Sequence, residues 1–178
     1  MARKISAVVA LLLGGVCWAA AGALGALDEN NLLMDVAKKP VPAFNFQSTL
    51  VGGQKVQLSD YKGNIVFLNF WATWCIPCVE EMPAMERLAA KLKGKPFRVV
   101  AVNMMEKNST VAKFVKKLKL TYDIVMDESG DIGGNYAANS LPLTYIIDKQ
   151  GNIIRRAVGA RIWDKKESVA FFEKLAAQ

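Results

Sequence analysis

The feature that most constrains the fold of this chain is an almost unbroken apolar run, Ile65–Trp71, in which only Asn69 is polar. The run is rich in β-branched and aromatic residues, which favour strands. Apolar side chains on both sides predict a strand buried on both faces, as in the centre of a sheet covered by helices. A cysteine-containing segment follows, and then apolar residues recur every three or four positions, which predicts a helix. These positions are Val79, Met82, Met85, Leu88, Ala89 and Leu92.

The remaining segments predict a β-hairpin, then β-α-β-α-β, then β-β-α. Alternating residues at 43–47 and 55–58, with Gly52 and Gly53 between them, predict the first hairpin. Further strands are expected at 97–103, 124–126, 143–148 and 153–158, and further helices near 109–119, 132–137 and 165–175. Strand–helix–strand crossovers give parallel pairs, whereas a late hairpin adds antiparallel ones. The chain is therefore expected to be an α/β protein, with a central mixed sheet, helices on both faces and an N-terminal β-hairpin extension.

The first residues have the pattern of an export signal. Arg3 and Lys4 precede a long apolar stretch, and small residues follow near Ala23. We interpret residues 1–23 as a signal peptide or an uncleaved membrane anchor, 24–41 as a linker or a loosely docked N-terminal segment, and 42–178 as the folded domain. Cys17 is preceded by Val rather than by the small residue typical of a lipid anchor, and is treated as an ordinary apolar residue of the signal.

Charge and composition exclude several kinds of function. The net charge of +7 comes from basic residues spread along the chain, which indicates a solvated surface, and no nucleic-acid partner is expected. The chain contains no histidine, so it can form neither a Ser–His or Cys–His catalytic pair nor a His-ligated metal site. Any acid–base step must use a carboxylate, Lys, Tyr, Cys or water.

Cys75 and Cys78 are predicted to be a redox pair at the junction of the buried strand and the helix. Unpaired N–H groups and the helix dipole favour a thiolate at a helix N-terminus. Cys75 is therefore assigned as the nucleophile, and Cys78, one turn later, as the thiol that resolves a mixed disulfide. Redox chemistry through this disulfide needs no other cofactor, and no metal is expected.

Three other interpretations of the pair fit the sequence less well. A structural disulfide that closes so short a loop would remove little entropy from the unfolded chain. A zinc site lacks further Cys or His ligands in the exported part, although copper(I) could accept two thiolates. Haem attachment needs His after the second cysteine, and residue 79 is Val.

Two further residues bear on the chemistry. Glu81 lies three positions after Cys78 on the same helix face, where a carboxylate could exchange the proton of Cys78; a solvated surface glutamate is the equal alternative. Pro142 precedes a predicted strand, and base rates for X–Pro bonds favour a trans peptide there.

The combined motifs resemble a known family. The segment 70–83, Phe-Trp-Ala-Thr-Trp-Cys-Ile-Pro-Cys-Val-Glu-Glu-Met-Pro, is similar to the active-site segment of TlpA/ResA-type thioredoxin-like proteins. The segment 58–63 resembles one that this family shares with its peroxiredoxin-related (AhpC/TSA) branch, and 141–148 resembles the family's cis-proline strand. The similarity covers about residues 42–175.

This resemblance implies a thioredoxin-like fold and an exported, often membrane-tethered reductant of protein disulfides. Cytochrome c maturation is a frequent destination in the family, and electrons come from a membrane thiol carrier of the DsbD/CcdA kind. By position, Pro142 becomes the cis-proline that aligns the substrate backbone, and Glu81 becomes the buried active-site acid. Protein thiols or disulfides are the expected partners, and we expect a monomer. Trp74, Ile76, Pro77 and Leu141 are expected to line the substrate groove.

The chain also departs from related patterns. Asn69 stands where ordinary thioredoxin has a buried Asp, which adds weight to Glu81, and Leu143 replaces the more usual Thr after the proline. A peroxiredoxin-type peroxidase would need Thr or Ser at position 72, which is Ala. An oxidase or isomerase of secreted thiols and a copper(I) chaperone without turnover are the alternatives to a disulfide reductase.

Overall fold

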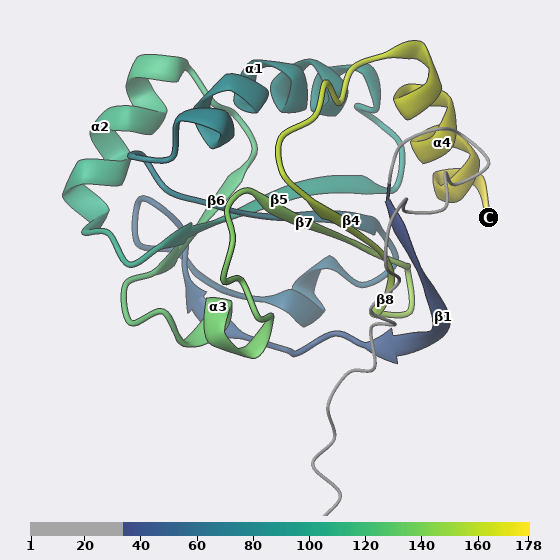
Figure 1. Ribbon diagram of the computed structural model, residues 1–178, viewed down its shortest axis with the longest axis horizontal. Helices are drawn as coiled ribbons and strands as arrows, with labels where there is room; N and C mark the ends of the chain where they lie inside the picture. Colours follow the sequence, from purple (N-terminus) through teal and green to yellow (C-terminus); the bar gives the residue numbers. More distant parts are fainter. Residues whose placement is uncertain (1–33) are drawn as a thin grey trace, which may run out of the picture.

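The computed structural model describes residues 34–178, whose centre is a six-stranded mixed sheet (Figure 1). The strand order is β1-β8-β7-β4-β5-β6. The pairs β4–β5 and β5–β6 are parallel, and the pairs β4–β7, β7–β8 and β1–β8 are antiparallel. The strands are β1 (Asp35–Pro42), β4 (Ile65–Trp71), β5 (Phe97–Met104), β6 (Asp123–Asp127), β7 (Leu143–Ile147) and β8 (Asn152–Val158). The predicted mixed sheet is confirmed.

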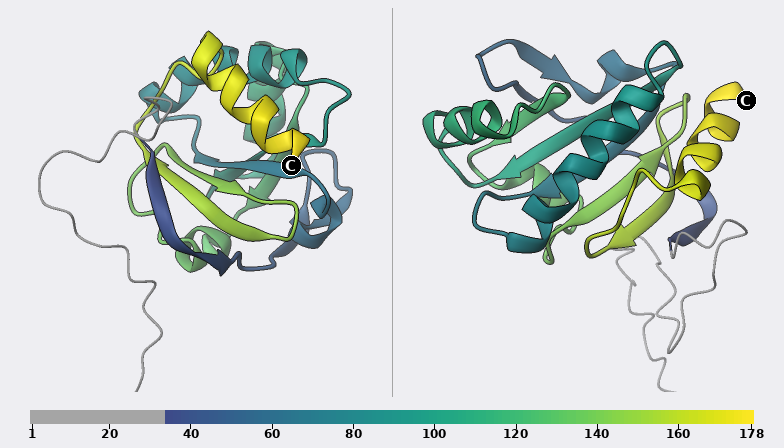
Figure 2. Two further views of the ribbon diagram at one scale, coloured as in Figure 1. Left: turned by 90° about the vertical axis from the view of Figure 1, so that its right-hand side faces the viewer. Right: turned by 90° about the horizontal axis from the view of Figure 1, so that it is seen from above.

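Helices cover both faces of this sheet, as predicted (Figures 1 and 2). One face carries the three longer helices: α1 (Ile76–Lys91), α2 (Asn108–Leu118) and α4 (Lys166–Ala177). The other face carries the short helix α3 (Asp131–Asn135), the 3-10 turn η1 (Leu58–Tyr61) and a separate hairpin of β2 (Gln47–Thr49) and β3 (Lys55–Gln57). Within 34–178, no helix is long and apolar enough to cross a membrane.

The central strand β4 is buried along its whole length because it contributes to both cores. Phe67 and Trp71 pack into the core under α1 and α4, whereas Leu68 and Phe70 pack into the core on the opposite face. Side chains alternate along a strand, so Asn69 shares the α1 face with Phe67 and Trp71. One polar side chain is thereby placed under α1, close to the end of the strand.

The predicted hairpin exists, but its first strand is shifted. Residues 43–46 are not a strand, and the pairing begins at Gln47, which lies opposite Gln57. Phe46 is nonetheless buried, and its carbonyl accepts a hydrogen bond from the backbone N–H of Leu58. The alternation of apolar and polar residues at 43–47 therefore arises from one buried aromatic residue and does not indicate a strand.

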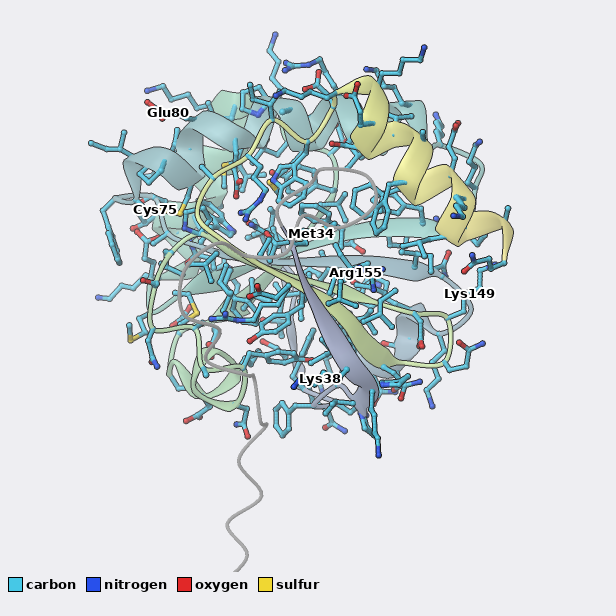
Figure 3. The ribbon with its side chains drawn as sticks, turned by 45° about the vertical axis from the view of Figure 1, so that its right-hand side comes forward. Met34, Lys38, Cys75, Glu80, Lys149 and Arg155 are labelled. Atoms are coloured by element: carbon cyan, nitrogen blue, oxygen red, sulfur yellow. A yellow bond between two sulfur atoms is a disulfide. The ribbon has the colours of Figure 1, made fainter. Side chains whose placement is uncertain are left out.

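The linker interpretation is wrong for residues 35–41, because they belong to β1, which pairs antiparallel with β8 at the edge of the sheet. Most side chains of β1 are exposed, and Lys38 points away from the domain (Figure 3). An edge strand with charged residues and proline is protected from pairing with other chains. The same composition is typical of loops, so the sequence does not reveal the strand. The predicted signal or anchor at 1–23 lies outside the described residues.

Candidate active site

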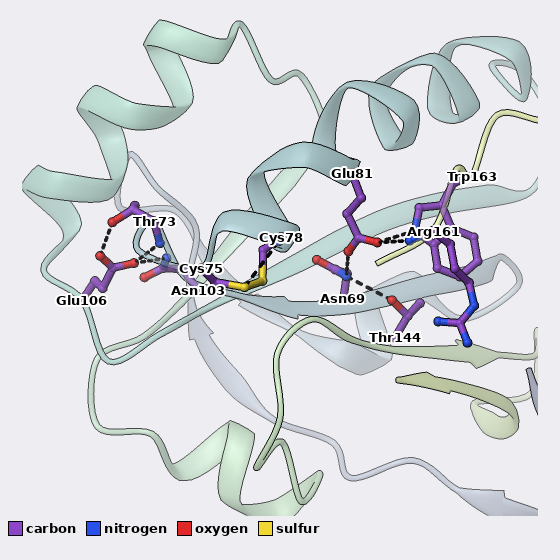
Figure 4. The surroundings of a disulfide bond; sticks show 10 residues. All are labelled: Asn69, Thr73, Cys75, Cys78, Glu81, Asn103, Glu106, Thr144, Arg161 and Trp163. Atoms are coloured by element: carbon purple, nitrogen blue, oxygen red, sulfur yellow. Dashed lines mark hydrogen bonds between the residues drawn. A yellow bond between two sulfur atoms is a disulfide. The ribbon is translucent and has the colours of Figure 1, made fainter. Parts of the chain in front are cut away.

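The two cysteines lie where β4 passes into α1, and they form a disulfide with a Cα–Cα distance of 5.3 Å (Figures 3 and 4). Cys75 is the N-cap of α1, and its Sγ accepts a hydrogen bond of 3.3 Å from the backbone N–H of Cys78. Pro77 occupies the first turn, where its missing N–H leaves no bond unmade. One backbone donor of the helix start therefore points at the sulfur of Cys75, and this position at the helix N-terminus favours a thiolate there.

The two sulfurs differ in access. Cys75 lines a surface groove, whereas Cys78 does not, and their exposed fractions are 6% and 1%. An incoming sulfur can therefore reach Cys75 but not Cys78. This asymmetry is consistent with Cys75 as the nucleophile and Cys78 as the resolving thiol, and the two roles stay predictions.

The groove beside Cys75 has a volume of about 760 Å³. All four residues expected to line a substrate groove do line it: Trp74, Ile76, Pro77 and Leu141. Leu141 comes from the segment before β7, so the groove joins the start of α1 to a distant part of the chain. The other lining residues, which the sequence did not indicate, come from the end of β5 and from α3 and the residues next to it.

The peptide bond between Leu141 and Pro142 is cis. The trans bond expected from base rates is wrong, and the cis bond implied by the family resemblance is observed. Pro142 immediately precedes β7, which pairs directly with β4. The carbonyl of Pro142 accepts a hydrogen bond from the backbone N–H of Gly159, which holds this turn against the segment after β8.

Glu81 is buried inside the domain, with an exposed fraction of 2%, whereas its neighbour Glu80 is exposed on α1 (Figure 3). Three donors converge on its carboxylate (Figure 4). Oε2 accepts from Trp163 Nε1 at 2.9 Å and from the backbone N–H of Arg161 at 3.0 Å, and Oε1 accepts from Asn69 Nδ2 at 2.9 Å. The alternative of a solvated surface glutamate is therefore wrong.

Burial raises the pKa of Glu81 above its usual range, because the charged form loses its hydration. The hydrogen bonds from Trp163, Arg161 and Asn69 act in the opposite direction, since each stabilises the carboxylate. A carboxyl group with a raised pKa can exchange a proton closer to neutral pH than an exposed glutamate can. Glu81 lies three residues after Cys78 on α1, and proton exchange with that thiol stays a prediction from this spacing.

Asn69 connects Glu81 to the sheet. Its Nδ2 also donates to Thr144 Oγ1 at 3.0 Å, and Asn69 and Thr144 lie directly opposite each other on β4 and β7. Asn69 carries no proton that it could transfer at neutral pH. Its amide therefore positions the carboxylate and leaves Glu81 as the ionisable group beside the cysteines.

Glu106 was not indicated by the sequence reasoning. Its Oε2 accepts from the backbone N–H of Thr73 at 2.7 Å and from Asn103 Nδ2 at 2.8 Å, and its Oε1 accepts from the hydroxyl of Thr73 (Figure 4). Thr73 belongs to the turn between β4 and Cys75, so Glu106 ties this turn to the end of β5. The sequence does contain a signal for this contact, because two polar residues, Asn103 and Glu106, lie at the carboxyl end of a buried strand.

No group of three or more His, Cys, Asp or Glu side chains lies arranged to hold a metal ion in the part of the chain that the structure describes. The reactive groups of the site are two sulfurs and one buried carboxyl group, and they lie beside an apolar groove. Such a site exchanges a disulfide with another molecule.

Comparison with known proteins leads to the same chemistry. The model of the AhpC/TSA family matches residues 37–156. Thiol-disulfide oxidoreductase ResA of Bacillus cereus (strain ZK / E33L) is 36% identical over 148 residues, which cover 82% of this chain and 86% of that protein. A crystal structure described as a DsbE-type thiol:disulfide interchange protein of Chlorobium tepidum is 33% identical, with a TM-score of 0.71, covering 79% of this chain and 99% of that one. StoA of Bacillus subtilis is 25% identical, with a TM-score of 0.62, covering 74% of this chain and 99% of that one. The chain belongs to the AhpC/TSA family and is a ResA-like thiol–disulfide oxidoreductase of thioredoxin-like fold.

Proposed function

We propose that this protein reduces disulfides of other proteins outside the cytoplasm, using Cys75 and Cys78 as a two-electron donor. The observation that carries this proposal is the unequal access of the two sulfurs: Cys75 opens onto the groove at a helix N-terminus, and Cys78 lies buried one turn later. Similarity to ResA supports thiol–disulfide chemistry, and the site geometry supplies the order of the steps.

The reaction starts from the dithiol form. The Cys75 thiolate attacks one sulfur of the substrate disulfide, a bond forms between the two sulfurs, and the other substrate sulfur leaves as a thiolate that takes up a proton. Cys78, once deprotonated, attacks Cys75 Sγ in the mixed disulfide. The second substrate thiol is released, and the Cys75–Cys78 disulfide forms. Two electrons have then passed from the protein to the substrate.

Glu81 has the role of proton acceptor for Cys78 in the second step. Its burial and raised pKa suit a group that gains and loses a proton during turnover. Trp163, Asn69 and the backbone of Arg161 hold the carboxylate in place. Pro142, in its cis form beside the groove, aligns the backbone of the bound substrate, and Trp74, Ile76, Pro77 and Leu141 contact its side chains.

The cellular setting follows from the sequence pattern and from the family. Residues 1–23 act as a signal peptide or a membrane anchor and place the domain in the periplasm or on the outer face of the cytoplasmic membrane. A membrane thiol carrier of the DsbD/CcdA kind returns the disulfide to the dithiol. Cytochrome c maturation, in which thiols must be kept reduced for haem attachment, is the proposed destination of the electrons.

The test is reduction of insulin disulfides with dithiothreitol as the electron source. The wild-type protein is expected to accelerate the reaction, Cys75→Ser to abolish turnover, and Cys78→Ser to accumulate mixed disulfides with partners. Activity in the Cys75→Ser variant would refute the assignment of the nucleophile. A protein that gave no turnover and retained one copper(I) per chain through dialysis would contradict the proposal and support a metallochaperone.

A further inference from the structure

The groove beside Cys75 is surrounded by large apolar side chains that the fold leaves exposed. Trp74, Ile76 and Met105 have exposed fractions of 66%, 71% and 63%. Among residues 34–178, none that lines the groove carries a charge. Exposed apolar residues that gather around one opening mark a binding surface, whereas scattered ones do not.

Two methionines that line the groove, Met104 and Met105, lie against glycines of the α3 region. A Cβ on Gly133 would stand 2.1 Å from Met104 Cε and 2.6 Å from its Sδ, and a Cβ on Gly130 would stand 3.1 Å from Met105 Cγ and Sδ. Glycine at these two positions therefore makes the space that the methionine side chains fill. Methionine is flexible and polarisable, so a wall of this kind can adapt to apolar side chains of different shapes.

Met105 also has an unusual backbone. Its φ is +56°, in the left-handed region that is unfavourable for a residue with a side chain. Its N–H donates a 2.8 Å hydrogen bond to the carbonyl of Asp127, which holds the residue in this conformation. Unfavourable backbone conformations that the surrounding structure maintains cluster at ligand-binding sites. Here the conformation accompanies a large apolar side chain that is exposed at the groove.

We propose that this groove selects substrate cysteines that directly follow a large apolar residue in the sequence, with Met105 as a residue that determines this specificity. The inference rests on the proposed function and names its substrate class. The occupant follows from the reaction, because a substrate sulfur must reach Cys75, which itself lines the groove. An extended peptide advances about 3.3 Å per residue, so the residues next to that cysteine fall within the groove.

The test uses disulfide-linked dimers of short peptides, acetyl-Gly-Xaa-Cys-Gly-amide, with Xaa as Leu, Phe, Asn or Asp. The reduced protein is mixed with each dimer, and the released thiol peptide is measured by liquid chromatography. Hydroxyethyl disulfide serves as a small substrate without side chains to fill the groove. We expect the single-turnover second-order rate constant for Leu and Phe to exceed that for Asn by about tenfold or more, which is the size of discrimination that an apolar pocket gives.

Two variants of Met105 separate specificity from folding. Met105→Asn removes the apolar side chain while placing a residue that tolerates positive φ, and the Leu-to-Asn ratio of these rate constants is expected to fall toward one. Met105→Leu keeps an apolar side chain and is expected to keep the ratio. Val36→Ser makes a similar apolar-to-polar change on the exposed edge strand β1 and should keep the wild-type ratio.

The outcomes distinguish this inference from the proposed function. A wild-type ratio near one, with hydroxyethyl disulfide still reduced, would overturn the inference and leave the reductase standing. An unchanged ratio in Met105→Asn would overturn the assignment to Met105. Failure to reduce hydroxyethyl disulfide, the peptides and insulin would refute the reductase itself, and the inference with it.

Discussion

Glu106 offers a sharp test of how the active-site turn is held. Its Oε2 accepts from the backbone N–H of Thr73 and from Asn103 Nδ2, and its Oε1 accepts from the hydroxyl of Thr73. In Glu106→Ala all three donors lose their acceptor. Water can replace the acceptor at Thr73, which is partly exposed, but Asn103 is fully buried. Its Oδ1 already lacks a partner, so its Nδ2 would become a second unsatisfied buried atom.

The expected magnitude follows from these contacts. Leaving one buried donor unsatisfied costs about 1–3 kcal/mol, and each lost hydrogen bond to a charged group removes about 1.5–3 kcal/mol, less where water substitutes. We therefore expect Glu106→Ala to lower the free energy of unfolding by about 2–4 kcal/mol.

Glu106→Gln provides the matched control because the geometry allows it to keep every bond. Its amide oxygen can replace Oε2 and accept from Thr73 N–H and Asn103. Its amide nitrogen can replace Oε1 and donate to the Thr73 hydroxyl, which rotates to accept. Only the charge is lost, so the expected loss is about 1 kcal/mol or less.

Urea denaturation of the oxidised proteins measures both variants, with unchanged m-values as the check that only stability has changed. Glu106→Ala within about 0.5 kcal/mol of wild type, the range of ordinary surface substitutions, would refute the structural role of Glu106. Equal losses of unfolding free energy in the Ala and Gln variants would refute the inference that Gln keeps all three hydrogen bonds.

Three further predictions concern Glu81 and the glycines of α3. Trp163→Phe removes one hydrogen-bond donor to the Glu81 carboxylate and should raise the pKa of Glu81 further. NMR titration of the labelled side chain measures this pKa, and an unchanged value would show that the bond from Trp163 does not control it. The pKa of Glu81 is raised in the folded state, so the folded protein binds the carboxyl proton more tightly than the unfolded chain does. The free energy of unfolding of the wild type should therefore fall as the pH rises above the unfolded pKa of about 4.3. Glu81→Gln should lack this fall in urea titrations across pH, and parallel curves would contradict the assignment. In thermal unfolding, Gly133→Ala should destabilise the protein by about 1–3 kcal/mol, since its Cβ would meet Met104 Cε at 2.1 Å. Gly134→Ala, with nothing within 4 Å of its Cβ, should be neutral or stabilising in the same thermal unfolding assay.

The sequence predicted the elements whose signal is local. Ile65–Trp71 was recognisable as a central strand because both of its faces are buried, and the redox pair because its spacing falls at a strand-to-helix junction. Residues 35–41 were missed because an edge strand needs only its partner β8, and its polar residues resemble a loop. The hairpin strand at 43–47 was misplaced because a single buried Phe46 imitates alternation.

The arrangement of the site depends on contacts between distant residues, which no local pattern contains. Glu81 takes its donors from Asn69, 12 positions earlier, and from Trp163, 82 positions later. Glu106 reaches Thr73 across 33 positions. The cis bond before Pro142 was expected only from the family resemblance, because base rates for X–Pro bonds favour trans. Spacing alone could place Glu81 on the helix but could not decide whether it was buried.

The reduction potential of the Cys75–Cys78 couple tests the central claim most directly. It is measured by equilibrating the protein in glutathione or dithiothreitol buffers and trapping the thiols that remain. A protein that donates electrons to substrate disulfides should have a potential near about −270 mV or lower, as thioredoxin has. A potential near about −120 mV, as in a strong oxidant of secreted thiols, would make the disulfide the reactive form and would contradict the proposed direction of electron flow.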